Sequence, residues 1–182
     1  LLAGEVKYKE SQKAYDEAIA LAEKSGLRRA VGTVLLAKAY VSGLQGRDTE
    51  SLELYFRAHQ LFEDLGDAAT ARSVLGSIGA AYAHDGASNE MLAKALTFHE
   101  RSIAPEAEKS ARHELATTYF NIAVVYQRLK DWPKATQFVT KSKALFNVLD
   151  DTIGEAFCSY RLGVLAGESG NWAEALGHQN TA

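Results

Sequence analysis

The chain has 182 residues, of which 47% are hydrophobic and 24% are charged, and its net charge is −3 at pH 7. This near balance argues against a nucleic-acid partner, because phosphate binding requires a clustered excess of lysine and arginine. No apolar run approaches the roughly 20 residues needed to cross a bilayer, so no membrane partner is expected for this segment. Cys158 is the only cysteine, which excludes an intrachain disulfide.

The chain is predicted to be helical throughout. Apolar residues recur with a period near 3.6, and no strand is evident. Glycine and aspartate supply the breaks, for example at Ser25-Gly26, Leu65-Gly66-Asp67 and Ser169-Gly170-Asn171. Nine helices are expected, over residues 5–25, 29–44, 49–65, 68–85, 89–104, 109–130, 132–148, 152–169 and 172–182.

The predicted linkers are short, so successive helices are expected to pack antiparallel. The clearest helix start is Asp131-Trp132-Pro133, where Asp131 can cap the helix and Pro133 loses no hydrogen bond. We expect a lone B helix followed by four A/B pairs, with the last B helix cut short after Trp172, Ala175 and Leu176.

One pattern recurs in the A helices: an apolar residue, a small residue, and an aromatic or small residue three positions on. The copies are Leu36-Ala37…Tyr40, Ile78-Gly79…Tyr82, Ile122-Ala123…Tyr126 and Leu162-Gly163…Ala166, at spacings of 42, 44 and 40 residues. The small residues are expected where another helix comes close, and the tyrosines are expected to fill the space between pairs. Longer turns are expected through Gly43–Asp48 and Gly86–Glu90. Such periodicity predicts stacked helix pairs.

The run Ile122-Ala123-x-x-Tyr126…Lys130-x-Trp132-x-x-Ala135 resembles the tetratricopeptide repeat, as does Leu162-Gly163…Gly170-x-Trp172-x-x-Ala175. The resemblance implies an all-α, right-handed superhelical solenoid of about four repeats plus a leading helix, forming one domain over residues 1–182. The spacing near 40 residues is similar to a longer-period branch of the family, common in bacterial regulators and in kinesin light chains.

The resemblance also implies a ligand groove on the concave side, lined by the A helices. Asn121 is the favoured contact, because its amide can bond a peptide backbone as donor and acceptor; alternatively it only ties adjacent turns of the solenoid. A surface suited to an extended peptide or an acidic partner helix would be completed by Phe120, Tyr160, Arg128 and Arg161. The candidate groove residues are Lys38, His84, Thr117, Phe120, Asn121, Val124, Gln127, Arg128, Tyr160, Arg161 and Glu168.

Other chemistry has little support. The five histidines form no His-x-x-x-His pair, so no metal site is expected. His59 and His99 occupy matching B-helix positions, which indicates repeat packing. Cys158 is expected to be a small buried residue. No motif for catalysis or for a cofactor occurs, so an enzyme is not expected.

The leading hypothesis is a non-catalytic module that binds a protein or peptide segment, as the sensor or scaffold part of a bacterial signalling or regulatory protein. The alternative is self-association through the terminal helices, including the face that carries Val6, Tyr8 and Tyr15. We expect a cytoplasmic location, with an extracytoplasmic or periplasmic sensor domain as the alternative. The first residue is Leu1 and the chain ends ten residues after Trp172, so a fragment of a larger protein is expected.

Overall fold

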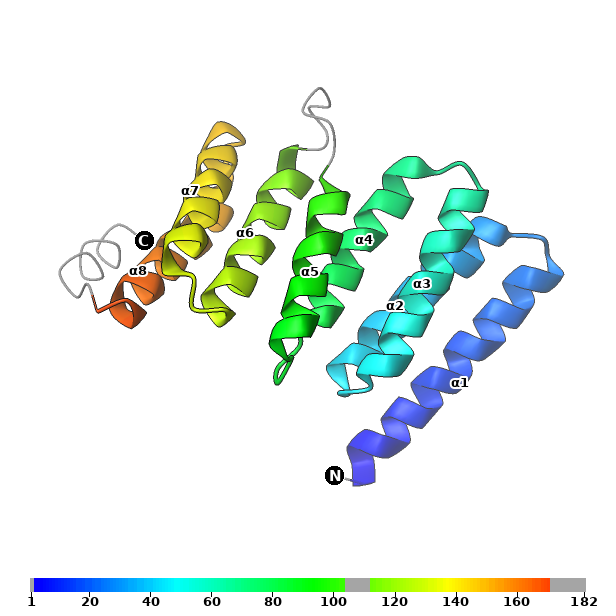
Figure 1. Cartoon of the computed structure of the whole chain (residues 1–182). Coiled ribbons are helices and arrows are strands. Elements are labelled where there is room, and N and C mark those ends of the chain that lie inside the picture. Colours follow the sequence, from blue (N-terminus) through cyan, green and yellow to red (C-terminus); the bar gives the residue numbers. More distant parts are fainter. Residues whose placement is uncertain (1, 104–111, 171–182) are drawn as a thin grey trace. The chain divides into compact units, whose positions relative to one another are not determined.

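A computed structural model describes residues 2–103 and 112–170, which contain eight helices and no strand (Figure 1). This confirms the predicted all-α fold class. The predicted helix over residues 172–182, with Trp172, Ala175 and Leu176, lies outside the described residues. The helices are α1 (Leu2–Lys24), α2 (Arg28–Leu44), α3 (Asp48–Asp64), α4 (Ala68–Tyr82), α5 (Asn89–Ser102), α6 (Arg112–Arg128), α7 (Trp132–Val148) and α8 (Thr152–Glu168).

The helices fall into two compact units, Leu1–His84 with α1 to α4 and Asp85–Ala182 with α5 to α8. In the first unit, α1 packs on α2, α2 on α3, and α3 on α4. In the second unit, α5 packs on α6, α6 on α7, and α7 on α8. The alternation of B and A helices is therefore as predicted, with α2, α4, α6 and α8 as the A helices.

Each described link between helices turns through one residue with a positive φ angle, and so does the end of α8. Five of these residues are glycines, which adopt this conformation without steric cost. Lys130 and Asp150 are the two exceptions, with φ angles of 60° and 55°. The full set is Gly26, Gly46, Gly66, Gly86, Lys130, Asp150 and Gly170. Neighbouring members within a unit stand twenty residues apart at positions 26, 46 and 66, and again at 130, 150 and 170.

This spacing corrects the predicted register of the first A helix. In α4, α6 and α8, the buried small residue stands seven positions before the turn residue that follows the helix; these small residues are Gly79, Ala123 and Gly163. The residue seven positions before Gly46 in α2 is Ala39, which is fully buried. Ala37 is exposed instead. Tyr40 is 61% exposed and fills no space between pairs. The first spacing is therefore 40 residues, not 42. The link between α2 and α3 covers residues 45–47, so the longer turn expected through Gly43–Asp48 is also wrong.

Aspartate caps hold the starts of several helices. The side chain of Asp131 accepts a hydrogen bond from the backbone N–H of Lys134 at the start of α7, as predicted. Asp67 does the same for Thr70 in α4, and Asp151 for Gly154 in α8. A cap of this kind stabilises the helix, because it satisfies a backbone donor that has no partner within the helix.

Apolar side chains fill the contacts inside each unit. In the second unit, Ala123, Val139 and Leu165 belong to a buried cluster against which Tyr126 and Trp132 pack. Trp132 is therefore a core residue, as predicted. Tyr126 stacks on Phe138 of α7, the other helix of its own pair, with ring centroids 5.6 Å apart.

Two buried hydroxyls join an A helix to the B helix of its own pair. Ser51 Oγ in α3 donates to the carbonyl oxygen of Ala39 in α2 at 2.8 Å. Ser142 Oγ in α7 donates to the carbonyl oxygen of Ala116 in α6 at 2.7 Å. Both serines are almost inaccessible to solvent, so each bond offsets the cost of burying a polar group.

Candidate functional site

The candidate site in the second unit is a face of α6 and α8, which we call the α6–α8 face. On α6, Ile122, Ala123 and Val125 are buried, whereas Phe120 and Asn121 are half-buried. The candidate residues from Thr117 to Arg128 recur at spacings of three and four, so they share one side of the helix. The members of the face are Thr117, Phe120, Asn121, Val124, Gln127 and Arg128 of α6, with Phe157, Tyr160, Arg161 and Glu168 of α8.

Arg161 connects the two helices of this face. Its guanidinium carbon lies 5.4 Å from the centroid of the Phe120 ring, which is a cation–π arrangement. Its Nη1 donates a hydrogen bond to Gln127 Oε1 at 3.0 Å. Gln127 Nε2 in turn donates to Glu168 Oε2 at 2.9 Å. Four of the predicted groove residues therefore form one connected network.

The remaining predicted residues of α6 lie beside this network. The Asn121 amide makes no hydrogen bond with any described residue, so both its donor and its acceptor are available. Thr117 Oγ1 donates to the carbonyl oxygen of His113, which occupies its hydrogen. Val124 is half-buried. Arg128 is also half-buried and already has an interaction. Asn121 is thus the free amide on this part of the face.

Exposed aromatic side chains lie on α8. Tyr160, which the sequence predicted, is 58% exposed. Phe157, which the sequence analysis did not select, is 61% exposed and lies three residues earlier, almost one helical turn away. Phe157 stands six residues before Gly163, as Thr117 stands six before Ala123. Applying the same offset to both helices could therefore have found it.

Two predicted residues belong to the first unit and are engaged elsewhere. Lys38 forms an ion pair with Asp16 of α1 at 2.6 Å, and its side chain is only 13% exposed. His84 Nδ1 lies 3.5 Å from the carboxylate of Asp48. The two-residue register correction explains why Lys38 is not exposed, because it places Tyr40, and not Lys38, on the exposed side of α2.

The surroundings of Cys158 are those of a structural residue. Cys158 is fully buried, as predicted, and its Sγ donates to Ser142 Oγ at 3.4 Å. Burial raises the pKa of the Cys158 thiol above its usual value. Within residues 2–103 and 112–170, no group of three histidine, cysteine, aspartate or glutamate side chains could hold a metal ion. None of the described helices combines the length and the apolar character that crossing a membrane requires.

Comparison with known proteins agrees with this architecture. Residues 114–182 match the family model of the tetratricopeptide repeat. The crystal structure of BtubC (BKLC) from P. vanneervenii is similar over 97% of this chain and 70% of that chain, with a TM-score of 0.72 and 19% identity. A putative kinesin light chain of Podosopora anserina with nearly identical TPR-like repeats is similar over 97% and 86%, with a TM-score of 0.69 and 12% identity. No curated protein sequence matches the chain.

These similarities agree with the helix pairs, the buried small residues of the A helices and the recurring turns. At such low identity the two crystal structures show the shared fold only. The family match covers the part of the chain that contains α6, α7 and α8. Tetratricopeptide repeats are protein-interaction or scaffold modules, and that is the function their presence implies. Residues 114–182 are therefore assigned to the tetratricopeptide repeat family, within a fold that the chain shares with such proteins.

Proposed function

We propose that the α6–α8 face binds an extended peptide or a helix of a partner protein. The observation that carries this proposal is the position of Arg161, whose contacts with Phe120 and Gln127 join the candidate residues of two A helices into one surface. The network fixes the side chains before a partner arrives, so less side-chain entropy is lost on binding.

The chemistry of the face suits a polypeptide. The free Asn121 amide can donate to a backbone carbonyl and accept from a backbone N–H. Phe157 and Tyr160 offer aromatic surface, and exposed aromatic residues are frequent anchors in protein interfaces. The Arg161 guanidinium forms no ion pair with a described carboxylate, so an acidic side chain of a partner would match its charge.

A displayed library of random peptides tests the proposal. The full chain is used to enrich binders, and the enriched peptides are then measured against variants. We expect Asn121→Ala, Tyr160→Ala and Arg161→Glu each to weaken binding about tenfold or more. Asn147→Ala on α7 and Arg57→Glu on α3 are matched controls that leave binding unchanged. Circular dichroism checks that each variant keeps its helices.

The proposal fails if peptides enriched on the wild-type chain bind the three face variants as tightly as they bind the wild type. It also fails if Arg57→Glu weakens binding as much as Arg161→Glu, because the effect would then follow net charge and not position.

We further propose that the module is the sensor or scaffold part of a bacterial signalling or regulatory protein. The support is the resemblance to longer-period tetratricopeptide arrays. The full-length sequence tests it: a neighbouring cyclase, kinase or DNA-binding domain would support the proposal, and a neighbouring domain without a regulatory role would contradict it.

Self-association is the second candidate function. Two leucines near the end of α1 favour it, because Leu21 is 67% exposed and Leu27 is 57% exposed. Tyr8, which was expected on the self-association face, is instead buried against α3. Light scattering over a dilution series decides the question, and a monomeric mass at all concentrations excludes this function.

A further inference from the structure

The contact between α1 and α2 contains a charged residue where the other A helices have an apolar one. Ile78, Ile122 and Leu162 stand eight residues before their turn residues, and all three are buried. The residue at this place in α2 is Lys38, with only 13% of its side chain exposed. A buried ammonium group is costly unless it is paired, and Asp16 of α1 pairs with it at 2.6 Å. Departures of this kind from a repeat pattern often mark a functional position.

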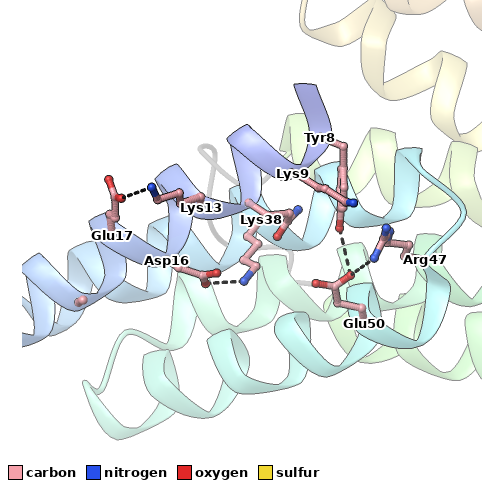
Figure 2. Close-up of a pocket in the computed structure, with 10 residues that line it drawn as sticks. Tyr8, Lys9, Lys13, Asp16, Glu17, Lys38, Arg47 and Glu50 are labelled. Atoms are coloured by element: carbon pink, nitrogen blue, oxygen red, sulfur yellow. Dashed lines mark hydrogen bonds and ion pairs between the residues drawn. The ribbon is translucent and has the colours of Figure 1, made fainter. Parts of the chain in front are cut away.

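A pocket of about 630 Å³ opens beside Lys38 (Figure 2). It is lined by residues of α1, α2 and α3 in the first unit, so it is a different site from the α6–α8 face of the second unit. Pockets of this size take small molecules or short peptide segments. The lining residues are Tyr8, Lys9, Gln12, Lys13, Asp16, Glu17 and Ala20 of α1, Lys38 of α2, Arg47 from the link before α3, and Glu50 of α3.

One end of the pocket is held by a fixed set of contacts. The Tyr8 hydroxyl donates to Glu50 Oε2 at 3.1 Å. Arg47 lies over the Tyr8 ring, 4.3 Å from its centroid, and 3.9 Å from the Glu50 carboxylate. Figure 2 shows these three side chains together at one side, with Asp16 and Lys38 at the other. With the Lys13–Glu17 and Lys38–Asp16 ion pairs, these contacts pair most of the charges in the pocket walls.

Two lining groups have no partner among the described residues. Both polar atoms of the Gln12 carboxamide are buried and make no hydrogen bond. A buried polar group in this state destabilises the folded chain, and a ligand that bonds to it would remove the cost. Gln12 has three rotatable side-chain bonds, so its amide can turn into the pocket that it lines. Lys9 is exposed and forms no ion pair.

We propose that this pocket binds an acidic segment of a partner polypeptide. Gln12 would bond a main-chain amide, because it offers one acceptor and donors side by side. A carboxylate of the segment would lie between Lys9 and Lys13. The charges agree, since the lining has four cations (Lys9, Lys13, Lys38 and Arg47) and three carboxylates (Asp16, Glu17 and Glu50), which leaves one positive charge for an anion.

Nuclear magnetic resonance of the ¹⁵N-labelled full chain tests the proposal. The probe is the capped peptide Gly-Glu-Glu-Gly, compared with its neutral twin Gly-Gln-Gln-Gly. We expect the acidic peptide to shift the Gln12 side-chain amide signal in a saturable way, with a dissociation constant of about 1 mM or tighter. The neutral twin is expected to bind about tenfold more weakly, and added salt to weaken the acidic peptide's binding.

Variants on α1 provide matched comparisons. Lys9→Glu and Gln12→Met should each weaken the acidic peptide about tenfold. Lys24→Glu makes the same charge change on the same helix outside the pocket, and it should leave binding nearly unchanged. Circular dichroism verifies that each variant keeps its helices. If Lys9→Glu disturbs the fold, Gln12→Met still tests the proposal, because it preserves the length of the side chain.

Three results would overturn the proposal: equal shifts with both peptides, equal losses in Lys9→Glu and Lys24→Glu, or no saturable shift of the Gln12 amide. Inorganic phosphate is the third probe, and equally strong binding of phosphate would show a simple anion site in place of a peptide site. This inference does not depend on the α6–α8 face. Asn121→Ala should leave the peptide titration unchanged, so the two proposals can fail separately.

Discussion

Nε2 of His113 lies 3.1 Å from Oδ2 of Asp151, and this contact joins the first turn of α6 to the capping residue of α8. Arg29 and Asp67 form the same link between α2 and α4 in the first unit. His113 stands 84 residues after Arg29, and Asp151 stands 84 residues after Asp67. The repeat therefore places a basic side chain opposite the helix cap twice, once an arginine and once a histidine.

The first prediction is that His113→Arg makes the second unit more stable at pH 7. Arginine carries a permanent charge and offers its donors in a planar fork that matches a carboxylate, which an imidazole ring does not. His113 is well exposed, so the gain is small, and we expect the midpoint of thermal unfolding to rise by no more than about 3 °C. The rise should shrink in high salt. Arg29→His is the reciprocal control and should lower the midpoint; an unchanged midpoint in both variants would contradict the prediction.

The second prediction concerns His99, which is 1% exposed and has a pKa lowered to about 4 by burial. The ordinary value is 6.5, so the unfolded chain binds a proton first as the pH falls. The stabilisation is present above pH 6.5 and is lost as the pH falls toward 4. We expect the free energy of unfolding to drop by about 3 kcal/mol over this range.

Tryptophan fluorescence during urea unfolding measures this change, because both tryptophans follow residue 85. His99→Leu should flatten the pH dependence between pH 4 and 7, since the unfolded chain then has one fewer proton to gain. His59, at the matching position of the first unit, pairs with Glu63 and serves as the control. If His59→Leu flattens the fluorescence-detected dependence as much, the assignment to His99 is wrong.

The third prediction is that Gly154→Ala destabilises the second unit. Gly154 lies in the first turn of α8, and a β-carbon there would approach the Phe146 ring of α7 to 2.5 Å. The ring must shift to admit it, which costs about 1–3 kcal/mol. Phe146→Leu removes the ring. In a double-mutant cycle, the double variant should therefore lose less free energy of unfolding than the two single variants lose in sum. Additive losses would rule out the steric cause.

The fourth prediction is that Lys130→Gly stabilises the link between α6 and α7. Lys130 has a φ angle of 60°, a conformation that costs a side-chain-bearing residue roughly 1–2 kcal/mol. Glycine removes this cost but adds freedom to the unfolded chain, so we expect a net gain of about 0.5 kcal/mol. Gly46→Ala makes the reverse change at the matching turn and should lower the free energy of unfolding, as measured by urea titration.

Local chemistry explains which parts of the fold were predictable. Gly26, Gly66 and Pro133 act through their own backbone conformations, so the helix boundaries near them could be inferred without knowing the packing. The register of α2 was wrong because Leu36-Ala37…Tyr40 imitates the repeat pattern. The burial of Ala39, seven residues before the turn residue Gly46, shows which side of the helix faces its neighbours. A single domain over residues 1–182 stays a prediction.

The candidate site was predictable in part for the same reason. Offsets along one helix selected Phe120 and Arg161, which the structure brings into contact, because residues that share a side of a helix are set by its period. The Gln127 bridge depends on how α6 and α8 pack, which the sequence does not specify locally. The pocket beside Lys38 requires side chains from three elements, so no motif in one segment indicates it.

The buried hydroxyls of Ser51 and Ser142 limit how the molecule can respond to a partner. If either B helix slid along its A helix by one residue, its hydroxyl would lose the carbonyl acceptor and be buried alone, at a cost of about 1–3 kcal/mol. Each pair, α2 with α3 and α6 with α7, is therefore expected to move as a rigid body. A partner that remodels this protein would change the angle between neighbouring pairs and leave the interior of each pair intact.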